Sequence, residues 1–416
     1  MPTGSLLLQH GDYTFTVDKE IGSGSFGFVW HARDQIRREV AIKVINKRMF
    51  LDAFTEEEED SNNCRSLRCD PKHWSPKEVI MQEFQALKKM SERNGFAATP
   101  LLNAFTDDYN IYFVMPYYPL DLRQFLLKMG CLPADTLQLW TAELMLGLKN
   151  IHDAGIIHCD LKPENVLLTP SGHVAIGDFG FSVSTTETRG PVGVGTPGYI
   201  ASELDSCRGL VGPSCKSDIY ALGIVILEMW IGTGESWYDL IAKRRRRPNC
   251  YNSERKPNEP SADLMKPQHL LKVIDDGDAM DLIHTMLLDD LGCRADWQDI
   301  FRNPYLTSFD MAEIRLRQHT TNVSPCAAIV EPRKLGTALA DFHRECGMSR
   351  LKQLKRLMRR LQQENEGPDP VEIDYARHGD ARQDPTHGTN CIRLGGGHCF
   401  YSAHPHRQCC RRTSHF

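Results

Sequence analysis

The chain has 416 residues, of which 41% are hydrophobic and 25% charged, and its formal net charge is −5. This composition is ordinary for a globular protein with a sizeable core, and the negative charge argues against a general nucleic-acid partner. The chain opens without a basic, apolar leader, and its longest apolar stretch, 221–231, is too short to cross a membrane. The 14 cysteines lack framework spacing, so we expect reduced thiols, an intracellular location and no membrane association.

The first part of the chain is predicted to be rich in strands. Residues 13–44 alternate apolar and polar side chains between glycines, which predicts a hairpin or meander. Residues 51–77 are polar and contain the acidic run 56–60, which indicates a mobile acidic insert, either solvated or able to bind a basic partner. A helix is expected over 79–90, and two strands over 101–115.

The middle of the chain is predicted to be mainly helical. Residues 136–154 carry an apolar stripe at helical spacing, and 217–231 are apolar on nearly all sides, as in a buried helix. Between them, 156–181 alternate short apolar runs with polar loops, and smaller helices are expected up to residue 306. A small β-rich half followed by a larger helical half predicts two lobes.

The last hundred residues differ in character. Residues 349–363 could form a basic amphipathic helix, which would either bind a partner, regulate the chain or remain unanchored, and the following residues suit a disordered tail. The Cys and His residues of this tail could bind zinc, but their spacing fits no standard site. The basic run 243–247 suits a solvated loop, an acidic substrate or nuclear import.

The segment Gly22-Ser23-Gly24-Ser25-Phe26-Gly27-Phe28-Val29 fits the pattern G-x-G-x-x-G-x-V. Glycines let a hairpin approach phosphates closely, because they have no Cβ. A dinucleotide site would need a helix after the glycines, whereas strands are predicted at 29–33 and 39–44. Lys43 lies at a suitable distance to reach phosphates, and Glu83 is the candidate carboxylate partner, although each could be an ordinary surface residue.

The most informative segment is His158-Cys159-Asp160-Leu161-Lys162-Pro163-Glu164-Asn165, followed by Asp178-Phe179-Gly180. Phosphoryl transfer needs a carboxylate that orients a hydroxyl and accepts its proton, which suits Asp160. It needs oxygen ligands for a hard cation, which suit Asn165 and Asp178. It also needs a cation beside the developing charge, which suits Lys162.

Together with the segment 195–203, Asp218 and Arg294, these motifs resemble those of the eukaryotic protein kinase superfamily over residues 13–306. The resemblance implies an α+β, bilobal fold. Its N-lobe would span 13–115, with the insert at 51–77, its hinge 116–119 and its C-lobe 120–306. Residues 1–12 would be an extension and 307–416 a tail. The implied activity is transfer of the γ-phosphoryl group of ATP to protein serine or threonine hydroxyls.

The resemblance also implies a role for individual residues. Asp160 would be the proton acceptor, Lys43 would bind the α- and β-phosphates and pair with Glu83, and Lys162 with Thr196 resembles the serine/threonine branch. Asn165 and Asp178 would hold Mg²⁺ or Mn²⁺. Phe179, Gly180, Thr196 and Glu203 would belong to the activation segment, with Glu203 paired to Arg294 and Asp218 anchoring the catalytic loop. ATP would be bound by Ile21, Gly22, Ser23, Gly24, Ser25, Phe26, Gly27, Val29, Ala41, Lys43, Met115, Pro116, Tyr118 and Leu167.

The hinge of the implied fold contains a proline. Met115 stands at the family's gatekeeper position and Pro116 follows it, where an acidic residue is more usual. Proline has no N–H but keeps its carbonyl, so Pro116 can still accept a hydrogen bond from adenine. Tyr118, two residues on, would donate its backbone N–H.

Two positions depart from the family's pattern. Cys159 replaces the arginine that normally pairs with a phosphate on the activation segment, and a neutral thiol cannot make that ion pair. Ser202 replaces the proline of Ala-Pro-Glu, which reduces backbone rigidity there. Such divergence would suit a kinase encoded by a large DNA virus, acting inside its host cell.

Two other functions compete with an active protein kinase. A pseudokinase scaffold, with the tail as the binding region for a regulatory partner, would be expected to have lost a catalytic polar group, yet Lys43, Asp160, Asn165 and Asp178 are all present. A small-molecule kinase is disfavoured because 195–203 resembles a platform for protein substrates. The sequence therefore favours a serine/threonine protein kinase.

Overall fold

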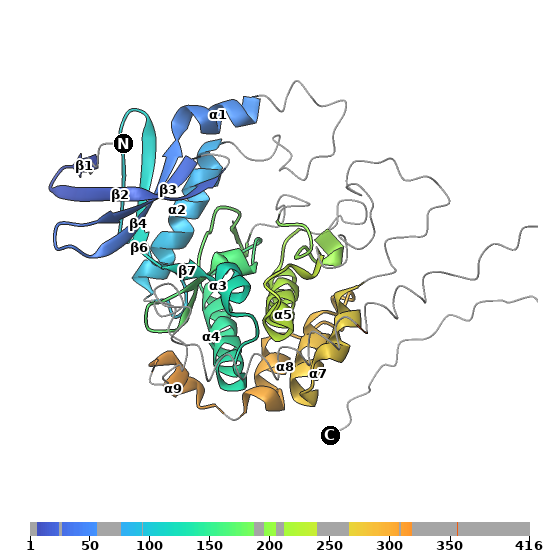
Figure 1. The fold of residues 1–416 in the computed structure, drawn as a ribbon. Helices are drawn as coiled ribbons and strands as arrows, with labels where there is room; N and C mark the ends of the chain where they lie inside the picture. Colours follow the sequence, from blue (N-terminus) through green and yellow to red (C-terminus); the bar gives the residue numbers. More distant parts are fainter. Residues whose placement is uncertain are drawn as a thin grey trace, which may run out of the picture. The chain divides into compact units, whose positions relative to one another are not determined.

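The computed structural model describes residues 6–24, 27–55, 76–93, 95–186, 195–204, 212–238, 266–307, 309–317 and 356. All of these residues lie in the first of two units, Met1–Glu366. Within that unit a β-rich N-lobe precedes a mainly helical C-lobe (Figure 1). The predicted bilobal α+β fold is therefore confirmed.

An antiparallel sheet forms the N-lobe, and its strands have the order β1-β2-β3-β4-β6-β5. The predicted strands over 13–44 and 101–115 are confirmed. The strands are β1 (Leu6–His10), β2 (Tyr13–Gly24), β3 (Gly27–Arg33), β4 (Glu39–Asn46), β5 (Asn103–Thr106) and β6 (Asn110–Pro116).

Strand β1 lies within the predicted N-terminal extension and pairs with β2 along its whole length. The imidazole of His10 stacks on the ring of Phe105 in β5, with 4.7 Å between ring centroids. The first and last strands of the sheet therefore approach each other, and the sheet is curled around a buried cluster that contains Phe15, Ile42 and Val114. Residues 6–10 thus belong to the folded lobe.

Two helices pack beside this sheet, α1 (Lys47–Thr55) and α2 (Pro76–Glu92). Part of the predicted acidic loop is therefore helical, since 51–55 end α1 and 76–77 begin α2. Asn46 provides the N-terminal cap of α1, because its Oδ1 accepts from the N–H groups of Arg48 at 3.1 Å and Met49 at 3.0 Å. Phe50, 3% exposed, anchors α1 in the core, while the acidic run 56–60 lies outside the described residues.

The C-lobe is built around α4 and α5, and the helices predicted over 136–154 and 217–231 are confirmed. Helix α5 begins at a Ser214 capping box and ends at Gly232 in the left-handed conformation. The described helices are α3 (Leu122–Met129), α4 (Ala134–Asp153), α5 (Cys215–Ile231), α7 (Gly277–Met286), α8 (Trp297–Arg302) and α9 (Met311–Arg315), with 3₁₀ turns η2 (Pro163–Asn165), η3 (Ser202–Leu204), η5 (Pro267–Val273) and η6 (Pro304–Leu306).

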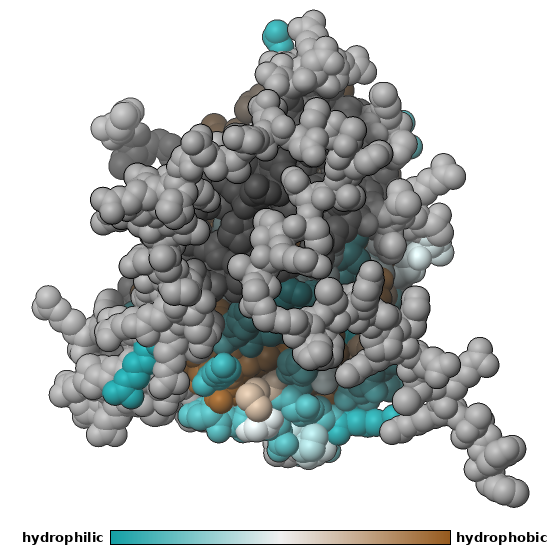
Figure 2. Space-filling view, turned by 90° about the vertical axis from the view of Figure 1, so that its right-hand side faces the viewer, coloured by the Kyte–Doolittle hydropathy of each residue, from teal (hydrophilic) through white to brown (hydrophobic). Residues whose placement is uncertain are grey.

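Short strands in the C-lobe carry the loops that hold the predicted catalytic residues. A three-stranded sheet has the order β10-β9-β7, and β11 pairs with β8. These strands are β7 (Leu120–Asp121), β8 (Ile156–Ile157), β9 (Val166–Leu168), β10 (Val174–Ile176) and β11 (Val183–Ser184). In Figure 2, hydrophilic residues cover most of the coloured surface of the lower part of the molecule, and hydrophobic residues are visible between them.

The folded region continues beyond residue 306, where the predicted C-lobe ends. Helix α9 is capped by Asp310, whose carboxylate accepts from the N–H of Ala312 at 2.7 Å. Ile314 is 1% exposed and joins the main hydrophobic core, and α9 packs against α4. The start of the predicted tail is therefore part of the domain. The predicted helix 349–363, apart from residue 356, lies outside the described residues, as do the Cys/His-rich tail and the basic run 243–247.

This boundary gives a first testable prediction. A chain that ends at Arg317 is expected to fold and to bind nucleotide, whereas a chain that ends at Asp310 should lose about 2 kcal/mol of stability with the buried Ile314 side chain. Thermal unfolding of the two truncated chains beside the full chain measures the difference. Equal melting temperatures for the two truncations would contradict a structural role of α9.

Among the described residues, no helix combines the length and the apolar character that a membrane span requires.

Candidate active site

Three predicted residues from distant parts of the chain meet at one ion pair. Lys43 on β4 places its Nζ 2.5 Å from Glu83 Oε1 on α2 and 3.2 Å from Asp178 Oδ1. The Glu83 side chain is almost fully buried, while that of Asp178 remains about half exposed, at 48%. The lysine thus links the N-lobe helix α2 to the loop after β10.

The charges in this cluster support one another. Burial lowers the pKa of Lys43, but the charges of Asp178 and Glu83 outweigh burial, so the pKa is raised above its ordinary value. The charge of Lys43 lowers the pKa of Asp178, against the effect of burial. Burial raises the pKa of Glu83, and Lys43 opposes this rise. Because the lysine stays cationic at 2.5 Å, we take Glu83 to be ionised.

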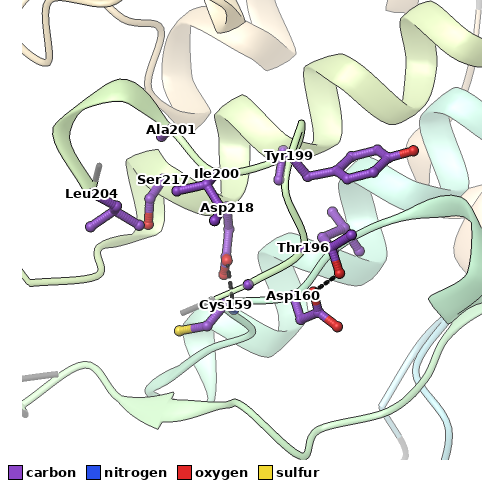
Figure 3. A pocket seen from close by; sticks show the side chains of 12 residues that line it. Cys159, Asp160, Thr196, Tyr199, Ile200, Ala201, Leu204, Ser217 and Asp218 are labelled. Carbon is purple, nitrogen blue, oxygen red and sulfur yellow. Dashed lines mark hydrogen bonds between the residues drawn. The ribbon is translucent and has the colours of Figure 1, made fainter. Parts of the chain in front are cut away.

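A second cluster surrounds the buried carboxylate of Asp160 (Figure 3). Thr196 donates its hydroxyl to Asp160 Oδ1 at 2.7 Å, and Lys162 Nζ lies 2.8 Å from Asp160 Oδ2 and donates to Thr196 Oγ1 at 2.7 Å. Asn165 Nδ2 donates to the backbone carbonyl of Asp160 at 2.7 Å. The carboxylate is therefore fixed in orientation by residues on both sides.

Asp218, at the start of α5, holds the catalytic loop from beneath. Its Oδ2 accepts from the N–H of His158 at 2.7 Å, and its Oδ1 accepts from the N–H of Cys159 at 2.9 Å. Cys159 has φ 67, a left-handed conformation that is unfavourable for residues other than glycine. Two hydrogen bonds to one buried carboxylate offset that strain and turn the chain so that Asp160 projects into the site.

His158 connects this loop to the Asp178 motif. Its Nε2 lies 3.0 Å from the carbonyl of Gly177, and its ring centroid is 5.3 Å from that of the fully buried Phe179. Asp178 itself has φ 59. Burial of Phe179 on one side and the Lys43 contact on the other therefore fix Asp178 in the left-handed conformation. Gly180 follows Phe179, and a Cβ on Gly180 would lie 3.3 Å from Asp178 Oδ1.

The predicted nucleotide residues line up on adjacent strands. Val29 pairs with both Gly22 and Lys43, and Ala41 pairs with Met115. Gly27 is required by space, because a Cβ there would meet the Val44 carbonyl oxygen at 1.8 Å. The remaining predicted positions lie on β2 (Ile21, Ser23 and Gly24), at the end of β6 (Pro116), just beyond it (Tyr118) and on β9 (Leu167). Ser25 and Phe26 lie outside the described residues.

The two predicted metal ligands offer oxygen atoms. The amide nitrogen of Asn165 is engaged by Asp160, at 2.7 Å from its carbonyl and 3.2 Å from its Oδ2, so Oδ1 is the atom left to bind a cation. Asp178 contributes an ionised, half-exposed carboxylate. An amide oxygen and a carboxylate suit a hard divalent cation such as Mg²⁺.

Glu203 and Arg294 also meet. Arg294 donates to both carboxylate oxygens of Glu203, at 2.6 and 2.8 Å, and to the carbonyls of Leu288 and Lys216. The guanidinium lies 5.0 Å from the ring centroid of Tyr220. This fully buried arginine joins the end of the 195–204 segment to α5 and to the loop before α8.

One cluster was missed in the sequence. Arg123 on α3 donates to Glu164 at 3.0 Å, to Glu228 at 2.8 Å and to the carbonyl of Gly234 at 3.1 Å, and it also contacts the Tyr199 hydroxyl. These partners lie at four separate places in the chain, so no local sequence pattern could predict that they meet. Because Glu164 belongs to the catalytic loop and Tyr199 follows Thr196, the cluster joins the two segments that flank Asp160.

A small pocket lies behind Asp160 and is bordered by Cys159, Thr196 and Asp218 (Figure 3). Its free space is about 10 Å³, which is room for one water molecule at most. In Figure 3 the Cys159 sulfur points away from the Asp160 carboxylate, whereas the Thr196 hydroxyl points towards it.

Comparison with known families agrees with this geometry. The family described as “Protein kinase domain” matches residues 15–306. The chain belongs to the protein kinase family. The resemblance inferred from the motifs is thereby confirmed, and the family implies ATP as substrate together with a divalent metal.

Several characterised kinases are similar to this chain. The serine/threonine-protein kinase Genghis Khan of Drosophila melanogaster is 35% identical over 167 residues, 37% of this chain and 10% of that protein. Mouse (Mus musculus) myotonin-protein kinase is 31% identical over 231 residues, 52% of this chain and 34% of that protein. Rho-associated protein kinase 1 of Oryctolagus cuniculus is 30% identical over 254 residues, 59% of this chain and 17% of that protein. The chain thus spans at most 34% of the length of these relatives, all of which are animal proteins.

Cys159 leads to a second prediction, on regulation. Without an arginine before Asp160, the kinase has no buried cation there that a phosphate must neutralise, so activity should not need phosphorylation of the activation segment. Ser182 is buried and donates to the Phe179 carbonyl at 2.8 Å, so its hydroxyl is not accessible for phosphorylation. The test variant should therefore keep Ser182. A variant with Ser184, Thr185, Thr186 and Thr188 changed to alanine should retain its rate within about tenfold.

The rates of this variant and of phosphatase-treated wild-type protein measure the effect. A loss larger than about tenfold, which is about 1.4 kcal/mol in the barrier, would show that the segment is switched by phosphate after all.

Proposed function

We infer that the chain is an active serine/threonine protein kinase that transfers the γ-phosphoryl group of ATP to a serine or threonine hydroxyl of a protein substrate. The observation that supports this most strongly is the joint placement of Lys43, Glu83 and Asp178 in one ion-paired cluster, with Asp160 oriented by Lys162 and Thr196 in another. The name of the relative Genghis Khan, a serine/threonine-protein kinase, supports the same function.

In this proposal each residue has a defined task. Lys43, held by Glu83, binds the nucleotide's phosphates, and the backbone of Pro116 and Tyr118 binds adenine. Asp160 orients the substrate hydroxyl and accepts its proton, while Lys162 stabilises negative charge that develops nearby. Asn165 and Asp178 would hold Mg²⁺, which neutralises phosphate charge when bound; Mn²⁺ offers the same octahedral, oxygen-loving chemistry.

A pseudokinase scaffold remains the competing function. Folding alone does not require the buried carboxylate of Asp160, which two side chains contact, because a buried charge costs free energy unless it is paired. Lys162 pairs with this carboxylate and Thr196 donates a hydrogen bond to it, and neither residue belongs to the main hydrophobic core. The retention of this costly arrangement favours catalysis.

The proposal extends to partners and location. We expect protein substrates, no nucleic-acid or membrane partner, an intracellular location and a regulatory partner that binds through the tail beyond Arg317. Cell fractionation of the tagged chain and affinity capture with a chain that ends at Arg317 would test these expectations.

The decisive experiment is transfer of radiolabelled phosphate from ATP, in the presence of Mg²⁺, to a serine- and threonine-containing peptide library, with the purified full chain. Label on serine or threonine is expected. Absence of label, from protein that binds nucleotide and is folded by calorimetry, would favour the scaffold. Label confined to tyrosine would overturn the assignment to the serine/threonine branch.

A further inference from the structure

Strand β10 lies at the edge of its sheet, and its outer side is covered by two other segments. Ile176 donates its N–H to the carbonyl of Ala97 and accepts from the N–H of Thr99, each at 2.8 Å. Two residues earlier, the carbonyl of Val174 accepts from Arg317 Nη2 at 3.2 Å. The arginine after α9 therefore continues the row of hydrogen bonds at the point where the segment 97–99 leaves it.

The backbone of Arg317 is in an unusual conformation. Its φ is 51, in the left-handed region, where a helix commonly ends with glycine. The N–H of Arg317 donates to the carbonyl of Ile314 at 2.9 Å, as expected for such a helix end. An arginine in this position costs more free energy than glycine would, so a compensating role of its side chain is the physical explanation.

The side chain of Arg317 makes its second contact with Phe96. The guanidinium carbon lies 5.4 Å from the centroid of the Phe96 ring, within the range of a cation–π interaction. Phe96 stands in the segment that follows α2. Next to it, Ala97 approaches α4 so closely that a Cβ on Gly147 would lie 2.9 Å from the Ala97 Cβ. Arg317 therefore clamps a segment that is already packed tightly on the C-lobe.

This segment is connected to both parts of the candidate nucleotide site. At one end it follows α2, which carries Glu83, the partner of Lys43. At the other side lies Tyr118: burial raises the pKa of its hydroxyl, and the charge of Arg317 opposes this rise. The charge of Arg317 thus acts on Tyr118, the hinge residue whose backbone N–H should bind adenine.

We propose that Arg317 is a positioning residue for nucleotide binding, which holds the 95–99 segment against the C-lobe and so fixes the position of α2, which carries Glu83. This role rests on the proposed kinase function. The chain beyond the C-lobe core thereby sets the affinity for ATP without touching the nucleotide.

The test uses the full chain and five variants: Arg317→Gly, Arg317→Lys, Phe96→Leu, the double variant Arg317→Gly with Phe96→Leu and, as a matched control, Arg315→Ala. Arg315 is exposed and lies in the last turn of the same helix. Glycine suits the left-handed backbone, so Arg317→Gly removes the side chain without straining the helix end. Four quantities are measured: the Kd of a non-hydrolysable ATP analogue by titration calorimetry, KM for ATP, kcat, and the melting temperature without nucleotide.

We expect Arg317→Gly to raise the Kd and the KM for ATP by about threefold to tenfold, the range of one lost cation–π contact and hydrogen bond, with kcat within about twofold and an unchanged or higher melting temperature. Phe96→Leu should act in the same direction, and the double variant should add little to either change alone. Arg317→Lys should bind more tightly than Arg317→Gly, because it keeps the cation, and Arg315→Ala should match wild type.

A wild-type Kd for Arg317→Gly would overturn the proposal, as would an equal loss in Arg315→Ala. A lower melting temperature, with Kd and kcat worsening together and no rescue by lysine, would reduce Arg317 to a structural residue. Wild-type protein that binds the analogue but transfers no phosphate would contradict the kinase function, while the Kd values would still decide the role of Arg317. Wild-type protein that binds no nucleotide would overturn both.

Discussion

Replacing Asp160 by asparagine is expected to lower the rate of phosphoryl transfer by about a hundredfold to ten-thousandfold, the range that a positioned general base contributes. Asparagine has nearly the same shape and can still accept a hydrogen bond from Thr196. It cannot accept the proton of the substrate hydroxyl, and it carries no charge to pair with Lys162. The loss should therefore fall on kcat rather than on the Kd of nucleotide.

The measurement is kcat for the phosphorylation of a peptide substrate, together with the Kd of an ATP analogue. Asp153→Asn is a matched control, since Asp153 is an exposed carboxylate whose only role in the described contacts is its pairing with Lys149 at the end of α4. This control should keep the wild-type rate. An Asp160→Asn protein as active as wild type, with the peptide labelled at the same site, would show that Asp160 is not the base.

The residues that meet in the candidate site could be predicted from sequence because phosphoryl transfer restricts residue types strongly. A lysine, two acids and an asparagine at family spacing left few alternatives, and the structure brings Lys43, Glu83 and Asp178 together across 135 positions of sequence. The long helices α4 and α5 could be predicted as well, because each has enough turns for its burial pattern to be visible in the sequence.

Short elements were harder to predict. Strand β1 has five residues and its two exposed leucines break the alternation of a half-buried strand. Helix α9 also has five residues, and only Ile314 is deeply buried. Each depends on a contact far along the chain, His10 on Phe105 for the strand and α4 for the helix, which a local pattern cannot reveal. The Arg123 cluster was missed for the same reason.

Loss of the metal site should have an effect as large as loss of the base. Chelation of divalent cations with EDTA is expected to abolish transfer, because phosphoryl transfer depends on neutralising phosphate charge. Asp178→Asn should reproduce most of this loss and lower the rate by at least about a hundredfold. The substitution removes the negative charge of Asp178, whereas the other ligand, Asn165, is neutral. Asparagine is preferable to alanine here, because Asp178 has φ 59 and asparagine tolerates this conformation better than alanine does.

The variant also has a distinct dependence on metal. If Asp178 holds the cation, Asp178→Asn should need a higher Mg²⁺ concentration for half-maximal binding of an ATP analogue, whereas Asp289→Asn, which changes an exposed acid paired with Lys266, should not.

The lowered pKa of Asp178 sets the pH range of this experiment. A carboxylate whose pKa is depressed in the folded state stabilises the fold above its unfolded pKa and loses that contribution only as the pH falls through the depressed value. Asp178 is therefore ionised throughout the neutral range, and full activity in EDTA, or a wild-type Mg²⁺ dependence in Asp178→Asn, would remove it from the metal site.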